Sequence, residues 1–347
     1  MLQSLLRLGG AGFLTLGLAG CGSAPPKPPK PASSATELAE EPAVSLAQAP
    51  TPPILLRDVG FLGPEAALHD PEADVYLVSN SNGGRGEADG NGFISRVSPD
   101  GTVLALKWID GAAGAGLDAP KGMALVGDEL FVADLTTLRS FDRKTGQALG
   151  KVAIATAQFL SDVAAAPDGT LYVSDTSLAK PKSKGKGKSG DEALDLGLQY
   201  NEKDAIFLVD DHGVARVFAR GRELGQPTGL LADAGGVWVT SLKGELYRLV
   251  TDGKRVASAQ LPGAGLQGLI ETETGRLALA SASTSSVYIG RRPPESGGEG
   301  APVTGGFEPV ITDLTLPGDI GYDRGRRQLI VPLVGENALY IQQIPSG

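Results

Sequence analysis

Six short segments carry polar side chains at matching positions, and these are the residues that could do chemistry. The segments are Pro64-Glu65-Ala66, Pro120-Lys121-Gly122, Leu160-Ser161-Asp162, Pro227-Thr228-Gly229, Leu266-Gln267-Gly268 and Pro317-Gly318-Asp319. Carboxylate, hydroxyl and amide oxygens could ligate a hard divalent cation, and a carboxylate could also act as a general acid or base. We call these six segments the repeat headings.

The elements that must position the headings are strands. Roughly ten residues after each heading comes a short apolar run that is typical of a buried strand. The six runs are Val75–Val78, Leu130–Ala133, Leu171–Ser174, Val237–Thr240, Leu277–Ala280 and Leu329–Pro332. A third strand follows each run, and turns such as Pro99-Asp100-Gly101 lead to a fourth.

A four-stranded antiparallel unit of this kind cannot bury both faces alone, so repeated units must pack against one another around an axis. Six headings therefore predict an all-β, six-bladed β-propeller over residues 54–347. The last unit lacks a fourth strand before the chain ends. We expect the segment Ile54–Val59 to join the last blade and close the ring.

The headings should meet at one mouth of the propeller channel, because loops from all blades converge where the inner strands begin. The predicted site residues are, for metal or ligand binding, Glu65, Ser161, Thr228 and Gln267; for ligand binding, Lys121; and for catalysis, Asp162 and Asp319. The two histidines, His69 and His212, are predicted to be turn residues on the far face. A histidine-based nucleophilic mechanism is therefore not expected at the mouth.

The first 20 residues have the features of a lipoprotein signal peptide. A weakly basic start precedes a glycine-diluted apolar stretch, which ends in Leu18-Ala19-Gly20-Cys21 and resembles a bacterial lipobox. We expect lipidation of Cys21; the alternative is an ordinary secretory signal followed by a fortuitous cysteine. Gly22 favours the periplasmic face of the outer membrane within the cell envelope. Residues 21–53 are predicted to form a Pro- and Ala-rich tether.

Bulk composition limits the partners. The formal net charge is −9, which gives no long-range attraction to nucleic acid. There is one cysteine, so no internal disulfide can form. We expect a monomer that meets the membrane through its lipid anchor alone and binds a small-molecule ligand or an envelope protein.

Two stretches interrupt the repeat. Residues 180–200 contain the run KPKSKGKGK and fall between the second and third strands of the third blade, and residues 290–306 form a Gly-, Pro- and Glu-rich loop in the fifth. The lysine run is interpreted as a solvated loop. The alternative is a basic lid that collects an acidic ligand, because loops between second and third strands emerge on the same face as the headings.

Several segments together resemble the senescence-marker-protein/gluconolactonase family of six-bladed propellers over residues 54–347. They are PEAALHD, YLVSNSNG, DGNGFISRVSPDG, APKGMAL, LFVADL, FLSDVAAAPDGTLYVSDT and PTGLLAD. The resemblance implies hydrolysis of sugar lactones or organophosphates with a divalent cation (Ca, Mn, Zn or Mg). In that family a glutamate, asparagines and an aspartate at the channel mouth hold the cation, which polarises a carbonyl and lowers the pKa of bound water.

Only part of this ligand set is present. The family's glutamate corresponds to Glu65, but its Asn-Asp appears as Ser161-Asp162, its Pro-Asn-Gly as Pro227-Thr228-Gly229, and its Asp-Gly as Gln267-Gly268. Lys121 in the adjacent blade is expected to compete with a cation for Glu65. An ion-paired structural carboxylate is the alternative role for Glu65.

Two main hypotheses follow. The first is a lipid-anchored envelope propeller that binds a small molecule or a protein partner at the mouth, with a degenerate metal site. The second is a divalent-metal-dependent lactonase or esterase in which Asp162 or Asp319 supplies the second charge and the general base. A purely structural role in envelope assembly is a third.

Overall fold

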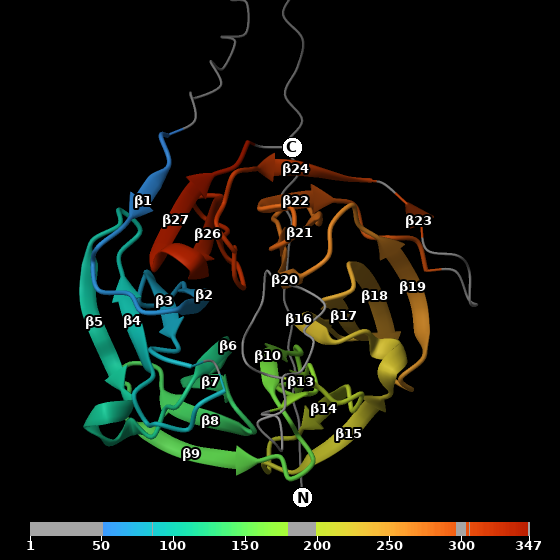
Figure 1. Ribbon diagram of the computed structural model, residues 1–347, viewed down its shortest axis with the longest axis horizontal. Helices are drawn as coiled ribbons and strands as arrows, with labels where there is room; N and C mark the ends of the chain where they lie inside the picture. Colours follow the sequence, from blue (N-terminus) through green and yellow to red (C-terminus); the bar gives the residue numbers. More distant parts are fainter. Residues whose placement is uncertain (1–50, 85, 180–198, 296–302, 305, 346–347) are drawn as a thin grey trace, which may run out of the picture. The chain divides into compact units, whose positions relative to one another are not determined.

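Six antiparallel sheets follow one another around a common axis (Figure 1). This computed structural model describes residues 51–84, 86–179, 199–295, 303–304 and 306–345, all within the unit that begins at Ala49. The predictions for residues 1–50, including lipidation of Cys21, lie outside the described residues, as does the lysine run. No helix in the described part of the chain is long and apolar enough to cross a membrane.

The first three blades each run from an inner strand to an outer strand in chain order. Blade one contains β2 (Pro64–Asp70), β3 (Val75–Asn80), β4 (Phe93–Val97) and β5 (Val103–Asp110). Blade two contains β6 (Pro120–Val126), β7 (Glu129–Asp134), β8 (Thr137–Asp142) and β9 (Ala148–Ala153). Blade three contains β10 (Leu160–Ala165), β11 (Leu171–Asp175), β14 (Ala205–Val209) and β15 (Ala215–Arg220).

The next two blades repeat this order. Blade four contains β16 (Pro227–Asp233), β17 (Gly236–Ser241), β18 (Glu245–Val250) and β19 (Arg255–Gln260), and β23 (Val303–Thr304) pairs in parallel with β19. Blade five contains β20 (Leu266–Glu271), β21 (Leu277–Ser281), β22 (Ser286–Gly290) and β24 (Phe307–Ile311).

The sixth blade joins the two ends of the propeller. It contains β25 (Gly321–Asp323), β26 (Gln328–Leu333), β27 (Ala338–Gln343) and β1 (Ile54–Leu56). Ile54 lies opposite Ile341 in an antiparallel pair, so the predicted closure is confirmed, with a strand that ends at Leu56 and not at Val59. The inner strand begins at Gly321, four residues later than the Pro317 heading suggested.

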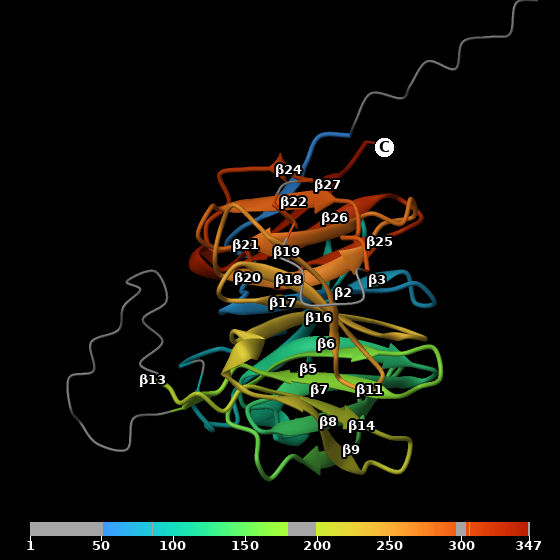
Figure 2. The ribbon, with the colours of Figure 1, turned by 90° about the vertical axis from the view of Figure 1, so that its right-hand side faces the viewer.

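Short elements fill the connections. They are the π-helical turn η1 (Gly111–Ala115), the 3₁₀ turns η3 (Arg222–Leu224) and η4 (Val334–Glu336), and the two-stranded hairpin β12 (Leu178–Ala179) with β13 (Gln199–Tyr200). In the edge view of Figure 2, β13 projects from one face of the ring.

Apolar side chains from neighbouring blades form the core. Between blades six and one, for example, Tyr76 and Val78 cluster with Ile330 and Ile341, and all four are buried. Second strands such as β3 and β17 are buried along their whole length, because each has a sheet neighbour on both sides and packs against the adjacent blades on both faces. This explains why the second strands are the most apolar runs in the sequence.

Candidate functional site

A β-bulge interrupts the inner strand at five of the six headings. The pairing register shifts between Pro64 and Ala66 in β2, between Leu160 and Asp162 in β10, and at corresponding points of β6, β16 and β20. A bulge leaves a residue outside the ladder and re-aims its side chain. The side chains re-aimed in this way include Glu65 and Ser161, so the site is built by irregular backbone at the start of otherwise regular strands.

Glycines allow the inner strands to come close enough for these side chains to meet. A Cβ added to Gly122 would lie 1.9 Å from Oδ1 of Asp162 in the next blade, and one added to Gly318 would lie 2.4 Å from the carbonyl oxygen of Glu65. No side chain fits at such distances. The backbone of blade six also bonds directly to blade one, since the amide of Asp319 donates to the carbonyl of Glu65 at 2.9 Å.

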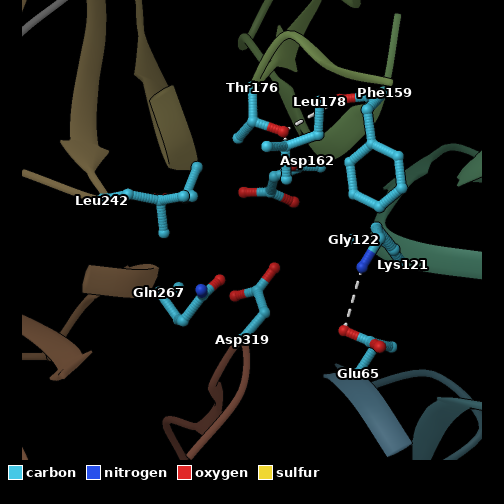
Figure 3. A pocket seen from close by; sticks show the side chains of 14 residues that line it. Glu65, Lys121, Gly122, Phe159, Asp162, Thr176, Leu178, Leu242, Gln267 and Asp319 are labelled. Carbon is cyan, nitrogen blue, oxygen red and sulfur yellow. Dashed lines mark hydrogen bonds and ion pairs between the residues drawn. The ribbon is translucent and has the colours of Figure 1, made fainter. Parts of the chain in front are cut away.

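The headings meet around one pocket of about 50 Å³ (Figure 3). The structure brings together all seven predicted site residues at its wall: Glu65, Lys121, Ser161, Asp162, Thr228, Gln267 and Asp319. The enclosed volume has room for a few water molecules, which is less than a drug-sized ligand needs. The pocket therefore suits a small polar molecule or one end of a larger one.

Sequence reasoning missed four of the side chains that line the pocket. Phe159 precedes the third heading, Thr176 and Leu178 follow the second strand of blade three, and Leu242 follows the second strand of blade four. Thr176, Leu178 and Leu242 could have been found from the sequence, because connections after second strands were expected on the same face as the headings. Figure 3 shows that the apolar side chains of Phe159, Leu178 and Leu242 line the pocket beside the carboxylates.

Glu65 and Lys121 form a buried ion pair across blades one and two. The Lys121 Nζ lies 3.0 Å from Oε2 of Glu65, and each residue is 7% exposed. The ammonium also lies 4.9 Å from the centre of the Phe159 ring, within the range of a cation–π contact. The predicted competition of Lys121 for Glu65 is therefore a direct contact, and the two charges neutralise each other inside the wall of the pocket.

Asp162 ties blade three to blade four. Its Oδ2 accepts a hydrogen bond from the backbone amide of Leu230 at 2.7 Å, and its Oδ1 accepts one from the amide of Val163 at 2.7 Å. Its own amide donates to the hydroxyl of Ser174 at 3.0 Å. Asp162 thus has a structural function in addition to its place in the pocket wall.

The carboxyls of Asp162 and Asp319 interact with each other, and both have raised pKa values. Burial, and next the negative charge of Asp319, raise the pKa of Asp162 well above its ordinary value. Burial raises the pKa of Asp319 to about 7, although a hydrogen bond with Asp162 and the positive charge of Lys121 act in the opposite direction. Two carboxyls so close together in a desolvated site hold one proton between them near neutral pH.

The two hydroxyls at the headings are engaged within the protein. The Thr228 hydroxyl donates to the carbonyl of Leu266 at 2.7 Å and also lies 3.1 Å from the Thr240 hydroxyl. The Ser161 hydroxyl lies 3.2 Å from that of Thr176. Thr228 therefore links blade four to blade five and does not present its proton to the pocket.

The donor set at the four positions expected to hold a divalent cation does not fit one. A cation there needs several oxygen ligands with negative charge. Glu65 is the one carboxylate among the four positions, and the Lys121 ammonium contacts it directly. Thr228 supplies a neutral oxygen whose hydrogen bonds go to neighbouring backbone. An ammonium thus stands beside the carboxylate that a metal would require.

The two histidines lie away from this pocket. His212 is in an exposed turn, as predicted. The prediction that His69 is a turn residue is wrong, because His69 lies in β2 opposite Tyr76 of β3, and its side chain is 12% exposed. The strand continues past it to Asp70, whose carboxylate caps the following turn by accepting from the amides of Glu72 and Ala73.

Solved structures share this fold, whereas no family model and no curated protein sequence matches the chain. A gluconolactonase from Xanthomonas campestris is 18% identical, with a TM-score of 0.54 over 84% of this chain and 89% of that one. A luciferin-regenerating enzyme is 10% identical, with a TM-score of 0.57 over 84% and 96% of the two chains. A virginiamycin B lyase from Staphylococcus aureus is 10% identical, with a TM-score of 0.54 over 85% and 99%.

These similarities confirm the predicted fold, a six-bladed propeller of the gluconolactonase type. Two of the names describe different reactions, a lactonase and a lyase, on the same architecture. The fold therefore does not indicate which activity a protein has, and the function has to be inferred from the residues of the pocket.

Proposed function

We propose that this chain is an envelope-anchored β-propeller that binds a small, uncharged, hydroxyl-bearing molecule at the pocket formed by the headings, without a metal. The observation that carries the proposal is the buried contact between Lys121 and Glu65 at 3.0 Å. In this arrangement Lys121, and not a metal ion, neutralises the Glu65 carboxylate.

The charges of the pocket favour an uncharged ligand. Glu65 and Lys121 cancel, and the Asp162–Asp319 pair holds one proton and one negative charge near neutral pH. A second anion would be repelled at low dielectric. Hydroxyl groups, in contrast, can donate to a carboxylate and accept from a protonated carboxyl or an amide such as that of Gln267.

Ligand-detected NMR with the full chain tests this proposal. The panel consists of neutral sugars and sugar lactones, matched with the corresponding sugar acids. We expect saturable binding of neutral compounds, no binding of the acids, and loss of binding in Gln267→Leu, with Asp211→Asn as a surface control. Tighter binding of the acids, or binding that survives Gln267→Leu, would contradict the proposal, and so would capture of an envelope protein in place of any small molecule.

Anchoring through Cys21 is part of the same proposal. It is supported by the apolar leader and the Leu18-Ala19-Gly20-Cys21 sequence. In a bacterium that processes lipoproteins, the unmodified chain should fractionate with membranes, and Cys21→Ser should be released by osmotic shock. Equal membrane association of both forms would rule out this anchor.

Hydrolysis of a lactone or ester is the second candidate function. The observation in its favour is the Asp162–Asp319 pair, because one ionised and one protonated carboxyl can serve as general base and general acid in a single step. Asp319 would take the proton from an attacking water, and Asp162 would protonate the departing oxygen.

A panel of lactones and esters, assayed with and without added Ca²⁺, Mn²⁺, Zn²⁺ or Mg²⁺, separates the two candidates. Turnover that disappears in Asp319→Asn would establish the hydrolase, and dependence on an added cation would establish the metal-dependent form. No turnover above buffer would leave ligand binding as the function.

A further inference from the structure

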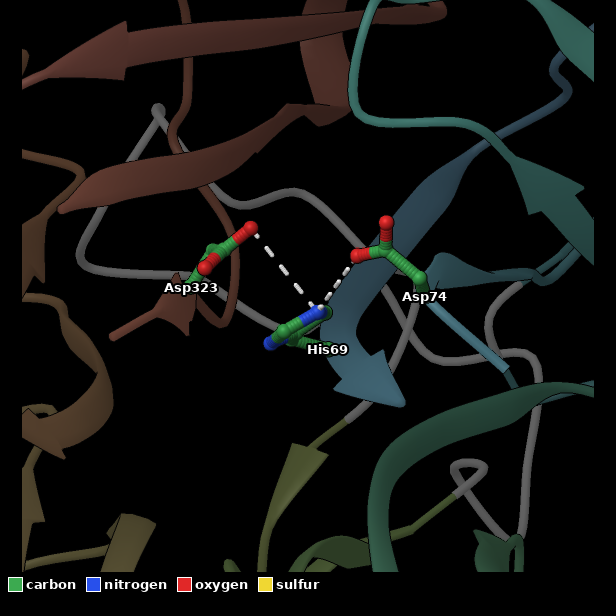
Figure 4. A group of neighbouring side chains, drawn as sticks. All are labelled: His69, Asp74 and Asp323. Atoms are coloured by element: carbon green, nitrogen blue, oxygen red, sulfur yellow. Dashed lines mark ion pairs between the residues drawn. The ribbon is translucent and has the colours of Figure 1, made fainter. Parts of the chain in front are cut away.

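A second cluster of ionisable side chains lies on blades one and six, away from the pocket (Figure 4). His69 belongs to β2, Asp74 to the turn that follows it, and Asp323 ends β25 in the neighbouring blade. His69 is five residues along β2 from Pro64, which places it about 16 Å from the heading of its own strand. The cluster is therefore separate from the Glu65–Lys121 pair.

The imidazole of His69 points one nitrogen between the two carboxylates. Its Nε2 lies 3.6 Å from Oδ1 of Asp74 and 3.8 Å from Oδ2 of Asp323. These distances exceed those of a hydrogen bond. Nε2 is buried and has no hydrogen-bond partner among the described residues. A buried polar atom of this kind calls for an explanation.

The two carboxylates are held by Arg326. Its Nη1 donates to Oδ1 of Asp74 at 2.7 Å and to Oδ2 of Asp323 at 2.8 Å, the same oxygens that face His69. These hydrogen bonds lower the pKa of Asp74. Burial by itself would raise the pKa of Asp323, but Arg326 and its neighbours keep it below the ordinary value. A single guanidinium therefore pairs with both carboxylates.

We propose that His69, Asp74 and Asp323 form a binding site for a divalent transition metal such as Zn²⁺, and that Arg326 holds the two carboxylates in position when no metal is bound. One imidazole nitrogen and two carboxylate oxygens are a donor set that Zn²⁺ uses, with a fourth position left for water. Zn–N and Zn–O bonds in a tetrahedral site place the ligand atoms about 3.4 Å apart. The observed distances from Nε2 of His69, 3.6 Å to Asp74 and 3.8 Å to Asp323, would have to shorten only slightly.

Arg326 must leave for the metal to enter. Its guanidinium occupies the same carboxylate oxygens, and two positive charges cannot share them at close range. The side chain is 43% exposed and Asp74 is 52% exposed, so solvent reaches the cluster and the arginine can turn outward. Metal binding at this site thus exchanges one cation for another. Metal affinity is set by competition with Arg326 and with the Tyr76 hydroxyl, which donates to the same Oδ2 of Asp323 at 3.0 Å.

The donor set also distinguishes this cluster from a calcium site. A nitrogen ligand favours Zn²⁺, Ni²⁺ or Cu²⁺ over Ca²⁺, which prefers oxygen alone. Binding here should therefore be insensitive to Ca²⁺.

Isothermal titration of the full chain with Zn²⁺ tests the proposal. We expect one site, with affinity at least tenfold lower in Asp74→Asn and in His69→Gln. Arg326→Gln should bind Zn²⁺ several-fold more tightly, because it removes the competing cation. His212→Gln is the matched control and should bind as the unmodified chain does, since it removes an exposed histidine elsewhere on the protein.

Asp74→Asn is the decisive variant, because the position is half exposed and has a φ of 51°, which asparagine adopts readily. Unchanged Zn²⁺ affinity in Asp74→Asn, weaker binding in Arg326→Gln, or loss of binding in His212→Gln would each overturn the proposal. Circular dichroism of each variant verifies that it is folded before titration.

Discussion

The ammonium nitrogen of Lys121 lies 3.0 Å from a carboxylate oxygen of Glu65, and both side chains are buried where the inner strands of blades one and two begin. The two residues are separated by 56 positions in the chain. Only the closure of adjacent blades around an axis brings them together. This pair engages the one carboxylate among the four positions expected to hold a metal.

Removal of Lys121 should destabilise the protein. Lys121→Met takes away the ammonium that neutralises a buried carboxylate, and breaking a buried pair in this way costs about 3 kcal/mol. The free energy of unfolding from urea titration measures the loss. Lys144→Met, at an exposed lysine that also contacts carboxylates, should leave the midpoint unchanged. Equal midpoints for Lys121→Met and the unmodified chain would contradict this assignment.

Removal of the same ammonium should also create cation affinity. In Lys121→Ala, Glu65 can contribute to a site for Ca²⁺ beside the Asp162–Asp319 pair, whereas the unmodified chain should show no Ca²⁺-dependent rise in melting temperature. The double variant Lys121→Ala/Glu65→Gln should lose the gain. A Ca²⁺ shift in the unmodified chain that Glu65→Gln abolishes would mean that a metal displaces the lysine.

The raised pKa of Asp319 predicts a pH dependence of stability. A carboxyl whose pKa is higher in the folded state binds more protons there, so its contribution is present at low pH and is lost as pH rises through about 7. Between pH 5 and 7 the slope for one such proton is about 1.4 kcal/mol per pH unit. Asp319→Asn should remove this slope. At pH 8 the variant should therefore have a higher free energy of unfolding than the unmodified chain.

Urea titrations at pH 5, 6, 7 and 8 measure this difference. Other buried aspartates, such as Asp134 and Asp175, also have raised pKa values and contribute to both curves equally. The difference between variant and unmodified chain therefore reports the Asp162–Asp319 pair, because the charge of Asp319 also raises the pKa of Asp162. Parallel curves would show that Asp319 titrates in its ordinary range.

Gly122 should not tolerate a side chain. Gly122→Ala places a methyl group 1.9 Å from the Asp162 carboxylate, and overpacking of this degree costs about 3 kcal/mol or more. Gly150→Ala, on an exposed strand where the added methyl group would lie 3.4 Å from the Ser140 hydroxyl, an ordinary contact distance, is the matched control and should be neutral. Thermal melts of the two variants provide the test, and equal stability would show that the blades can move apart at no cost.

Most of the fold could be predicted because it depends on local patterns. Each apolar run, such as Val75–Val78, signals a buried strand by composition alone, and repetition of the pattern six times requires radial packing. The closing strand could be predicted by counting strands, since the last unit has only three of its own and Ile54–Leu56 supplies the fourth. His69 was misplaced because a strand continues past the point where its apolar pattern ends.

The sequence by itself determined which heading residues face the common pocket, since position within a repeat fixes position around the axis. The tertiary structure alone decided how they interact. Bulges set the direction of the heading side chains, and close contacts at glycines set the distances between neighbouring inner strands. Neither feature is encoded in a periodic sequence pattern. The pairing of Lys121 with Glu65 and of Asp162 with Asp319 arises from such short distances, because electrostatic energies in a desolvated site vary steeply with separation.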